Sequence, residues 1–412
     1  KDPQAWTDER QKWIDEVWTP YREQYAEREA RAYDDTRWRK AVVAPVGVFE
    51  LSEDGKRIEC VGIQCLPATG GETPRIYRPD EGWAWHQAKL ALQCGDGNVH
   101  QAISHLAETH LVQEVCNLAM LRQLSHMHPL HHLLEPHFDG TFAINSAADS
   151  SLVGPSSGVD SVMMGTIGTS VDVVHAGVKN YDFNAKMYPH QMKLRGFDDE
   201  VTKNLHYSYR EDGWEVWRAY HTFVEGYVDH YYRSDGDVAG DFELQAFVKE
   251  ISQGGFQNVG EKGSATVSTK AYLVDMITHI IFNGSAQHAA VNFPQIDLMA
   301  YAPNHPLAMY SFKTDDVTEQ DFLDCLPPMP AAVEQLNLGK LLGSIHYTEL
   351  GHYPSKLLGI GHYFNPDEVQ ALNDQLLGNF KALEAKIDAR IESGKDNYHY
   401  LKPSTIPMSI NI

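Results

Sequence analysis

Residues 100–145 read HQAISHLAETHLVQEVCNLAMLRQLSHMHPLHHLLEPHFDGTFAIN, and this stretch decides the fold and the chemistry. Apolar residues recur along it at helical spacing, and we expect a long buried helix over residues 86–127. Its histidines follow the pattern H-x4-H-x17-H-x8-H. A lone histidine is most often a core or surface residue whose ring has ordinary hydrogen-bond partners. We therefore predict a metal site from the spacing of the histidines and not from any one of them. The four are His105, His110, His128 and His137.

The first pair, His105 and His110, lies five residues apart. On a regular α-helix such a step leaves the two side chains roughly 140° apart, which is poorly placed for one metal ion. A π-bulge inserts an extra residue into a turn and brings positions i and i+5 onto the same side. If both histidines bind one ion, we expect the helix to be locally wide at these residues.

A second long helix is predicted over residues 267–293, where His288 and Asn292 stand four residues apart on one face. His279 lies nine residues before His288 and would point away on a regular helix, so we exclude it. The backbone carboxylate of Ile412 would complete the set. Three imidazoles, one amide oxygen and one carboxylate suit a redox-active, non-haem iron better than a structural zinc. The five cysteines have no metal-ligand spacing.

The flanking sequence predicts a small sheet before the helices. In residues 41–66, AVVAPVGVFELSEDGKRIECVGIQCL, two β-rich runs flank Asp54-Gly55-Lys56, as in a hairpin. Pro- and Gly-rich residues 67–82 follow, and the pattern is then helical almost to the end. Residues 1–39 predict an N-terminal helical extension and residues 40–412 one mostly helical domain, with a single continuous domain 1–412 as the alternative.

One aromatic stripe has two interpretations. Its residues recur at three- and four-residue steps, which could line a cofactor but more often marks a core-facing helix. We therefore predict a core helix. The stripe comprises Trp214, Trp217, Tyr220, Val224, Tyr227 and Tyr231.

Composition excludes several partner classes. The net charge of −22 argues against nucleic acid as a partner and against docking on anionic membranes through a basic face. Five scattered cysteines, an odd number, predict reduced buried thiols.

No apolar run reaches the length of a membrane span, and the N-terminus is not signal-like. A cytoplasmic protein is the resulting expectation.

With these motifs the chain resembles the lipoxygenase family. The histidine stretch follows that family's signature helix, GSAQHAAVNFPQ matches its second metal helix, and IPMSINI matches its C-terminus. The resemblance covers roughly residues 40–412 and implies a mostly α catalytic domain with long central metal-bearing helices. The family's N-terminal β-barrel has no counterpart in this chain, as in compact bacterial-type members.

The resemblance implies a role for each matching residue. It implies one iron per chain, and manganese is the alternative because the two metals share this ligand set. His128 and His137 belong to the motif as structural residues. The implied metal ligands are His105, His110, His288, Asn292 and the carboxylate of Ile412. Gln101 and Gln295 would connect the metal shell to the substrate cavity, Ala148 would control product stereochemistry, and Val159, Val162 and Met163 would close the substrate channel.

The implied reaction is dioxygenation of polyunsaturated fatty acids of the linoleic and linolenic type. A ferric hydroxide would take a hydrogen atom from a bis-allylic CH2, and O2 would trap the radical as a conjugated-diene hydroperoxide. Alanine at position 148 accompanies S products in the family and glycine R products, although compact members break this rule. The resemblance leaves open a transient membrane contact and a catalase-like domain upstream in the full-length gene product.

Two competing classes remain. A catalytically inactive relative could keep the fold as a binding protein, but the intact ligand set argues against it. Gly154-Pro155-Ser156-Ser157-Gly158 matches the G-x-S-x-G motif of serine hydrolases. That motif requires a preceding buried strand within alternating strand–helix units, which the surrounding sequence does not predict. Metal analysis together with oxygen uptake on linoleate separates these readings.

Overall fold

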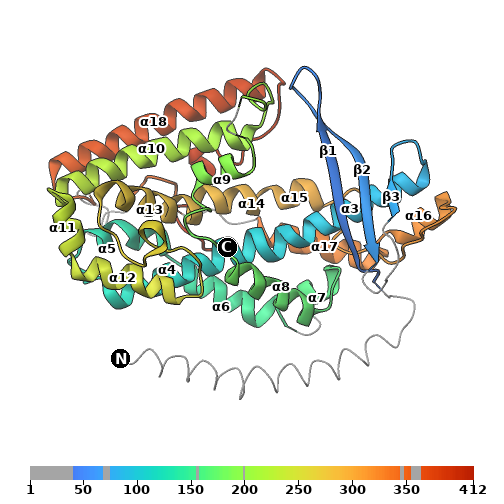
Figure 1. The fold of residues 1–412 in the computed structure, drawn as a ribbon, viewed down its shortest axis with the longest axis horizontal. Coiled ribbons are helices and arrows are strands. Elements are labelled where there is room, and N and C mark those ends of the chain that lie inside the picture. The colour runs from blue at the N-terminus through green and yellow to red at the C-terminus, as the bar shows by residue number, and fades with distance from the viewer. Residues whose placement is uncertain (1–39, 68–74, 155–156, 198–199, 344–347, 354–362) are drawn as a thin grey trace, which may run out of the picture.

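The computed structural model describes residues 40–412, except 68–74, 155–156, 198–199, 344–347 and 354–362 (Figure 1). The predicted N-terminal extension, residues 1–39, lies outside the described residues. The division of the chain at residue 40 therefore stays a prediction.

A small antiparallel sheet precedes the helices, as predicted. Its strands are β1 (Val43–Leu51), β2 (Ile58–Pro67) and β3 (Arg75–Tyr77), in the order β1-β2-β3. The predicted turn between β1 and β2 contains Gly55, which has a φ of 70° and donates its N–H to the Ser52 carbonyl at 2.8 Å. The third strand falls in the Pro- and Gly-rich segment, where no strand was predicted, and it is only an edge strand of 3 residues.

One continuous helical stretch crosses the molecule and confirms the first predicted central helix. It consists of α3 (Trp83–Val99), the π-helix η3 (His100–His110) and α4 (Leu111–Gln123). The widened segment contains both histidines of the five-residue step, so the predicted local widening is confirmed. The α3 part packs on the sheet, and the η3 part contacts the helices farther along the chain.

A second stretch confirms the other predicted central helix. It consists of α13 (Lys270–Phe282), the π-helix η6 (Asn283–Gln287), α14 (His288–Asn292) and α15 (Pro294–Met299). Thr269 begins it by accepting a hydrogen bond from the Tyr272 N–H, which satisfies one free donor of the first turn. The π-helical turn η6 was not predicted. Both central stretches therefore contain a widened turn, and η3 contacts η6 and α14.

The remaining helices surround these two stretches (Figure 1). They are α5 (Pro129–Leu134), η4 (Glu135–Phe138), α6 (Thr141–Ser151), α7 (Gly158–Val162), α8 (Ile167–Lys179), α9 (Tyr188–Leu194), α10 (Ser208–Tyr231), α11 (Asp235–Gly240), α12 (Phe242–Gln253), η5 (Glu261–Gly263), α16 (Glu319–Cys325), α17 (Met329–Leu342), α18 (Asp367–Glu392) and η7 (Pro403–Thr405).

The aromatic stripe lies on α10, which packs between α13 and α18. Trp217, Tyr220 and Tyr227 of this stripe are buried in the main hydrophobic cluster, with Trp214 and Tyr231 packed against it. The stripe is therefore core packing, as predicted, and Figure 1 shows α10 and α18 running alongside one another over α13.

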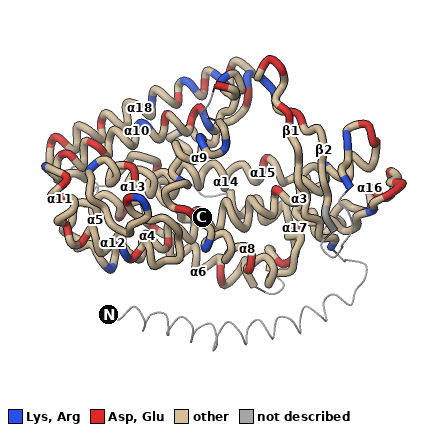
Figure 2. The backbone as a smooth tube through the Cα atoms, in the orientation of Figure 1, with Lys and Arg blue, Asp and Glu red and all other residues tan. Residues whose placement is uncertain are grey.

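Charged residues gather on the outer helices and loops, whereas α14 carries none (Figure 2). Both signs are interspersed there, with acidic residues in excess. No described helix combines the length and the apolar character that crossing a bilayer requires.

The hydrolase motif lacks the context that its chemistry requires. Residues 155 and 156 lie outside the described part, and Ser157 directly precedes the short helix α7. In the described part of the chain, all strands of the sheet lie between Val43 and Tyr77. No strand therefore leads into the motif within the described residues.

Candidate metal centre

Three imidazoles converge between the two central stretches. The Nε2 atoms of His105 and His110 are 3.2 Å apart, and the Nε2 atom of His288 lies 3.3 Å from the first and 3.2 Å from the second. The first two rings come from η3 and the third from the start of α14. The widened turn of η3 thus places residues five positions apart on one side of the helix, facing a ring from the other stretch.

All three rings are buried and neutral. Burial lowers the pKa of His110 to about 4, and it lowers the pKa values of His105 and His288 well below the usual range. Each neighbouring imidazole further lowers the pKa of His105 because two positive rings would repel. Neutral imidazole is the form in which histidine binds metal ions.

A hydrogen bond fixes the ring of His110. Its Nδ1 lies 2.8 Å from Oδ1 of Asn145, whose amide also donates to Glu114 Oε2 at 2.6 Å and to the His110 carbonyl at 3.2 Å. A neutral ring that donates from Nδ1 carries a bare lone pair at Nε2. This lone pair faces the other two rings. In metal sites, a hydrogen bond from the second ring nitrogen ordinarily orients the histidine in this way.

The arrangement fits a metal cation. The candidate donor atoms of the three histidines all lie within 4.8 Å of one another. Where the Nε2 atoms carry no proton, their lone pairs at 3.2–3.3 Å repel one another unless a cation lies among them. Imidazole nitrogens are donors that transition-metal ions such as iron accept.

Gln101 and Gln295 form a chain of hydrogen bonds that ends at Asn292. Gln101 Nε2 donates to Gln295 Oε1 at 2.6 Å, and Gln295 Nε2 donates to Asn292 Oδ1 at 3.0 Å. Asn292 in turn donates its Nδ2 to the carbonyl of Leu342 at 2.8 Å, which fixes which end of the amide carries the oxygen. Asn292 and Gln295 are both buried on the stretch that carries His288.

The C-terminal segment is held inside the molecule. His137 Nδ1 donates to the Met408 carbonyl at 2.9 Å, and Thr141 Oγ1 donates to the Ile410 carbonyl at 3.1 Å. Ile412 itself is buried, and Figure 1 marks the C-terminal end well within the body. These contacts attach the end of the chain to η4 and to the start of α6, the helix that carries Asn145. The role of the Ile412 carboxylate as a ligand stays a prediction.

Gly140 makes this docking possible. Its φ is 77°, and an added Cβ would lie 2.9 Å from the Cβ of Asn411. A side chain at this position would therefore collide with the C-terminal segment and strain the backbone.

Two motif histidines have structural contacts. His137 also bonds through Nε2 to the hydroxyl of Tyr353 at 3.0 Å, so both its ring nitrogens are engaged. His128 accepts from the Leu130 N–H at 3.1 Å and caps α5, while its Nε2 contacts Asp241 at 3.0 Å. Neither ring belongs to the converging group, as expected of structural residues.

The three predicted channel residues belong to one apolar cluster. Val162 and Met163 are buried there against Ala102 and Ala107 of η3, and Val159 packs against the same cluster. Ala148 lies elsewhere, on α6, three residues after Asn145 and partly buried. The structure thus brings the channel residues together beside η3. Ala148 instead lies on α6, the helix whose Asn145 is hydrogen-bonded to His110.

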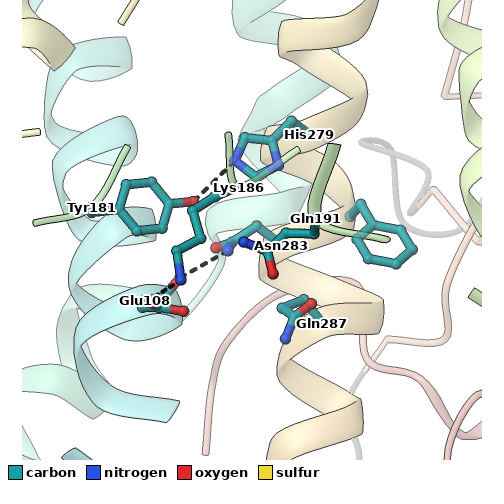
Figure 3. A pocket seen from close by; sticks show the side chains of 8 residues that line it. Glu108, Tyr181, Lys186, Gln191, His279, Asn283 and Gln287 are labelled. Atoms are coloured by element: carbon teal, nitrogen blue, oxygen red, sulfur yellow. Dashed lines mark hydrogen bonds and ion pairs between the residues drawn. The ribbon is translucent and has the colours of Figure 1, made fainter. Parts of the chain in front are cut away.

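A separate polar pocket lies between the central stretches and the segment around α9 (Figure 3). Lys186 pairs with Glu108, and the hydroxyl of Tyr181 lies 2.9 Å from His279 Nε2. Burial lowers the pKa of His279 to about 3, so its ring is neutral. His279 therefore faces Tyr181 and not the converging rings, in agreement with its exclusion from the metal set. The lining residues are Glu108, Tyr181, Lys186, Gln191, His279, Phe282, Asn283 and Gln287.

Sequence reasoning missed Asn145, which holds His110, and Glu114, which accepts a hydrogen bond from Asn145. Asn145 ends the quoted stretch but stands 35 residues after its partner, and no local periodicity joins the two. The signal available in the sequence was the place of Asn145 at the end of the histidine-rich stretch.

Known proteins resemble this chain over most of its length. The Lipoxygenase family model matches residues 49–390. Linoleate 9/13-lipoxygenase of Pseudomonas aeruginosa is 38% identical over 384 residues, which are 90% of this chain and 55% of that protein. The epidermal-type polyunsaturated fatty acid (12S)/(13S)-lipoxygenase of Mus musculus is 30% identical over 377 residues, with the same two coverages of 90% and 55%.

Solved structures agree with these sequence matches. A crystal structure of a LOX in complex with arachidonate has a TM-score of 0.82 at 27% identity, covering 90% of this chain and 55% of that one. Coral 8R-lipoxygenase also has a TM-score of 0.82 at 27% identity, covering 91% and 57%. The chain thus spans about half the length of the curated relatives it matches.

Proposed function

The chain belongs to the lipoxygenase family, as its motifs predicted, and we propose that it is a non-haem iron lipoxygenase. Its substrates would be O2 and polyunsaturated fatty acids of the linoleic and linolenic type, and its products conjugated-diene hydroperoxides. The convergence of three buried, neutral imidazoles at 3.2–3.3 Å supports this proposal most strongly.

The proposed ligands are His105, His110, His288, Asn292 and the carboxylate of Ile412. Iron is the proposed metal, with manganese as the alternative because both accept this N/O donor set. When bound, the metal would supply the one-electron oxidation of a bis-allylic CH2 and the acceptor for its proton.

The protein's own residues would perform the positioning. Asn145 orients His110, and the hydrogen bonds from Gln101 through Gln295 orient the amide of Asn292. The apolar cluster beside η3 excludes water and would set how far a fatty acid chain slides in. Such placement decides which carbon reacts, because the abstraction requires one CH2 at the metal.

Incubation with linoleate tests this function. We expect oxygen uptake and a product with the ultraviolet absorbance of a conjugated diene, because a pentadienyl radical trapped at either end leaves two conjugated double bonds. Oleate is the matched control, since it lacks a bis-allylic CH2 and should give no uptake. A metal-loaded protein that consumes no oxygen with linoleate would favour the inactive binding-protein alternative.

Substitution of Val159 tests the proposed channel. Val159→Phe should shift the positional isomer ratio of the hydroperoxides toward shallower entry, and Val159→Ala should shift it oppositely. The reason is side-chain bulk at the closed end of the cavity, and the measurement is chromatography of the positional isomers. A loss of rate in both variants with unchanged products would show ordinary core packing instead.

Substitution of Ala148 tests the proposed stereocontrol. Ala148→Gly should change the R:S ratio, with an S-rich wild type expected, because a methyl group blocks oxygen from one end of the radical. A difference of about 1.4 kcal/mol between the two trapping barriers already gives a tenfold preference. Ala147→Gly is the control, since it places the same helix-weakening glycine at the exposed neighbouring position. Equal product chirality in wild type and Ala148→Gly would remove Ala148 from oxygen control.

A further inference from the structure

The two π-helical segments are joined by side-chain amides. Asn283, the first residue of η6, donates its Nδ2 to the Glu108 carbonyl in η3 at 2.8 Å. Gln113 on α4 donates its Nε2 to the Ile280 carbonyl at 3.0 Å, in the last turn of α13 before η6. Each central stretch thus sends one amide to a backbone carbonyl at or beside the widened turn of the other.

The two amides also bond to each other. Gln113 Nε2 lies 2.9 Å from Asn283 Oδ1. Gln113 is fully buried and Asn283 nearly so. Gln113 Nε2 and both polar side-chain atoms of Asn283 are bonded, whereas Gln113 Oε1 has no hydrogen-bond partner among the described residues. Loss of a partner by a buried polar atom is costly. The three hydrogen bonds therefore form a fixed link, which we call the amide clamp, consisting of Gln113, Asn283 and the carbonyls of Glu108 and Ile280.

Gly284 leaves the space that the amide clamp occupies. A Cβ added there would lie 2.8 Å from Gln113 Oε1 and 2.9 Å from its Cδ, both too close. Any larger residue at position 284 would have to displace the Gln113 amide. The clamp is thus built from one side chain on each stretch and a glycine that accommodates them.

The clamp lies close to the candidate metal ligands along both stretches. Glu108 stands between His105 and His110 in η3, and Asn283 precedes His288 by five residues. Widened turns are rare and depend on surrounding contacts to persist. A link that crosses between two such turns fixes how far one stretch lies from the other.

We propose that Asn283 and Gln113 are positioning residues, whose amide clamp sets the place of His288 relative to His105 and His110. This inference rests on the proposed function in that the three histidines bind a metal. The polar pocket supports it, because Asn283 lines that pocket, where Lys186 pairs with Glu108 on the same turn of η3 (Figure 3). A contact to the side chain of Glu108 and one to its backbone carbonyl thus hold the widened turn.

The main test measures iron affinity in Gln113→Leu, a substitution of similar size without hydrogen bonds. We expect roughly tenfold to hundredfold weaker iron binding, the loss that follows removal of groups orienting metal ligands. Gln87→Leu is the matched control. Gln87 is equally buried and its Nε2 donates to the Lys313 carbonyl at 2.7 Å, but it precedes His105 by 18 residues, about 27 Å along the helix.

The comparison separates positioning from general stability. Both variants should lower the melting temperature of the metal-free protein, but only Gln113→Leu should lower iron affinity by tenfold or more and change the electron paramagnetic resonance spectrum of the ferric form. Equal iron affinities in Gln113→Leu, Gln87→Leu and wild type would overturn the proposal.

A second test uses the space at Gly284. Gly284→Ala should weaken iron binding as much as Gln113→Leu does, because the added methyl displaces the amide. The double variant should then be no weaker than Gln113→Leu alone, since both changes remove the same link. Additive losses in the double variant would contradict the clamp.

Amide hydrogen exchange of the metal-free protein tests the clamp independently of metal binding, and so independently of the proposed function. Gln113→Leu should speed amide exchange in both His100–His110 and Asn283–Gln287, whereas Gln87→Leu should not. A wild type that binds neither iron nor manganese would end the proposed function, whereas unchanged exchange in both segments would end the clamp.

Discussion

His288→Ala is expected to fold and to lose iron, with binding weakened by at least about a hundredfold, because groups that merely orient ligands already contribute tenfold to a hundredfold. The ring of His288 is one of three that converge, and two imidazoles leave an incomplete set of donors. Metal content after dialysis and oxygen uptake with linoleate measure the effect, and both should fall together.

The control is His279→Phe on the same helical stretch. His279 is nearly as buried as His288, yet its ring contacts Tyr181 and not the converging rings. The variant should lose stability because Tyr181 is left unpaired, but it should retain iron. Full iron content in His288→Ala would remove this residue from the site.

Extension of the chain by one glycine after Ile412 is expected to lower activity by at least about a hundredfold, on the same grounds as loss of an imidazole ligand. The extension replaces the terminal carboxylate with a neutral amide. Ile412 is only 6% exposed, so the added residue also enters a filled space. Oxygen uptake measures activity, and circular dichroism checks that the helices persist.

Ile412→Ala is the matched control, because it removes the apolar side chain and keeps the terminal carboxylate. Large-to-small substitution of a buried residue costs roughly 2–5 kcal/mol of stability, so its melting temperature should fall while iron stays bound. A fully active enzyme with a C-terminal extension would exclude the carboxylate as a ligand.

Local patterns predicted the parts of this molecule that local geometry controls. Helical spacing predicted both central stretches, and the five-residue step from His105 to His110 predicted the widened turn of η3. The exclusion of His279 was also consistent with the structure, although η6 lies between it and His288. The widened turn η6 was not predicted, because no pair of predicted ligands is spaced so as to require one.

The long-range contacts at and beside the histidines could not be read from spacing. Asn145 meets His110 across 35 positions, and Asn283 meets Glu108 across 175. Such pairs depend on how α6 and the second central stretch pack against η3, which periodicity does not encode. The ligand roles of all five residues stay predictions. The structure brings the rings of His105, His110 and His288 together, and it buries Asn292 and Ile412.

X-ray absorption at the metal K-edge of the purified protein tests the central claim most directly. The position of the edge identifies iron or manganese, and the fine structure reports the atoms bound to it. We predict an iron edge, a shell of nitrogen and oxygen atoms only, and the outer scattering that imidazole rings give, which should weaken in His288→Ala. A zinc edge with four-coordinate geometry, or a sulfur atom in the first shell, would contradict the proposed metal centre.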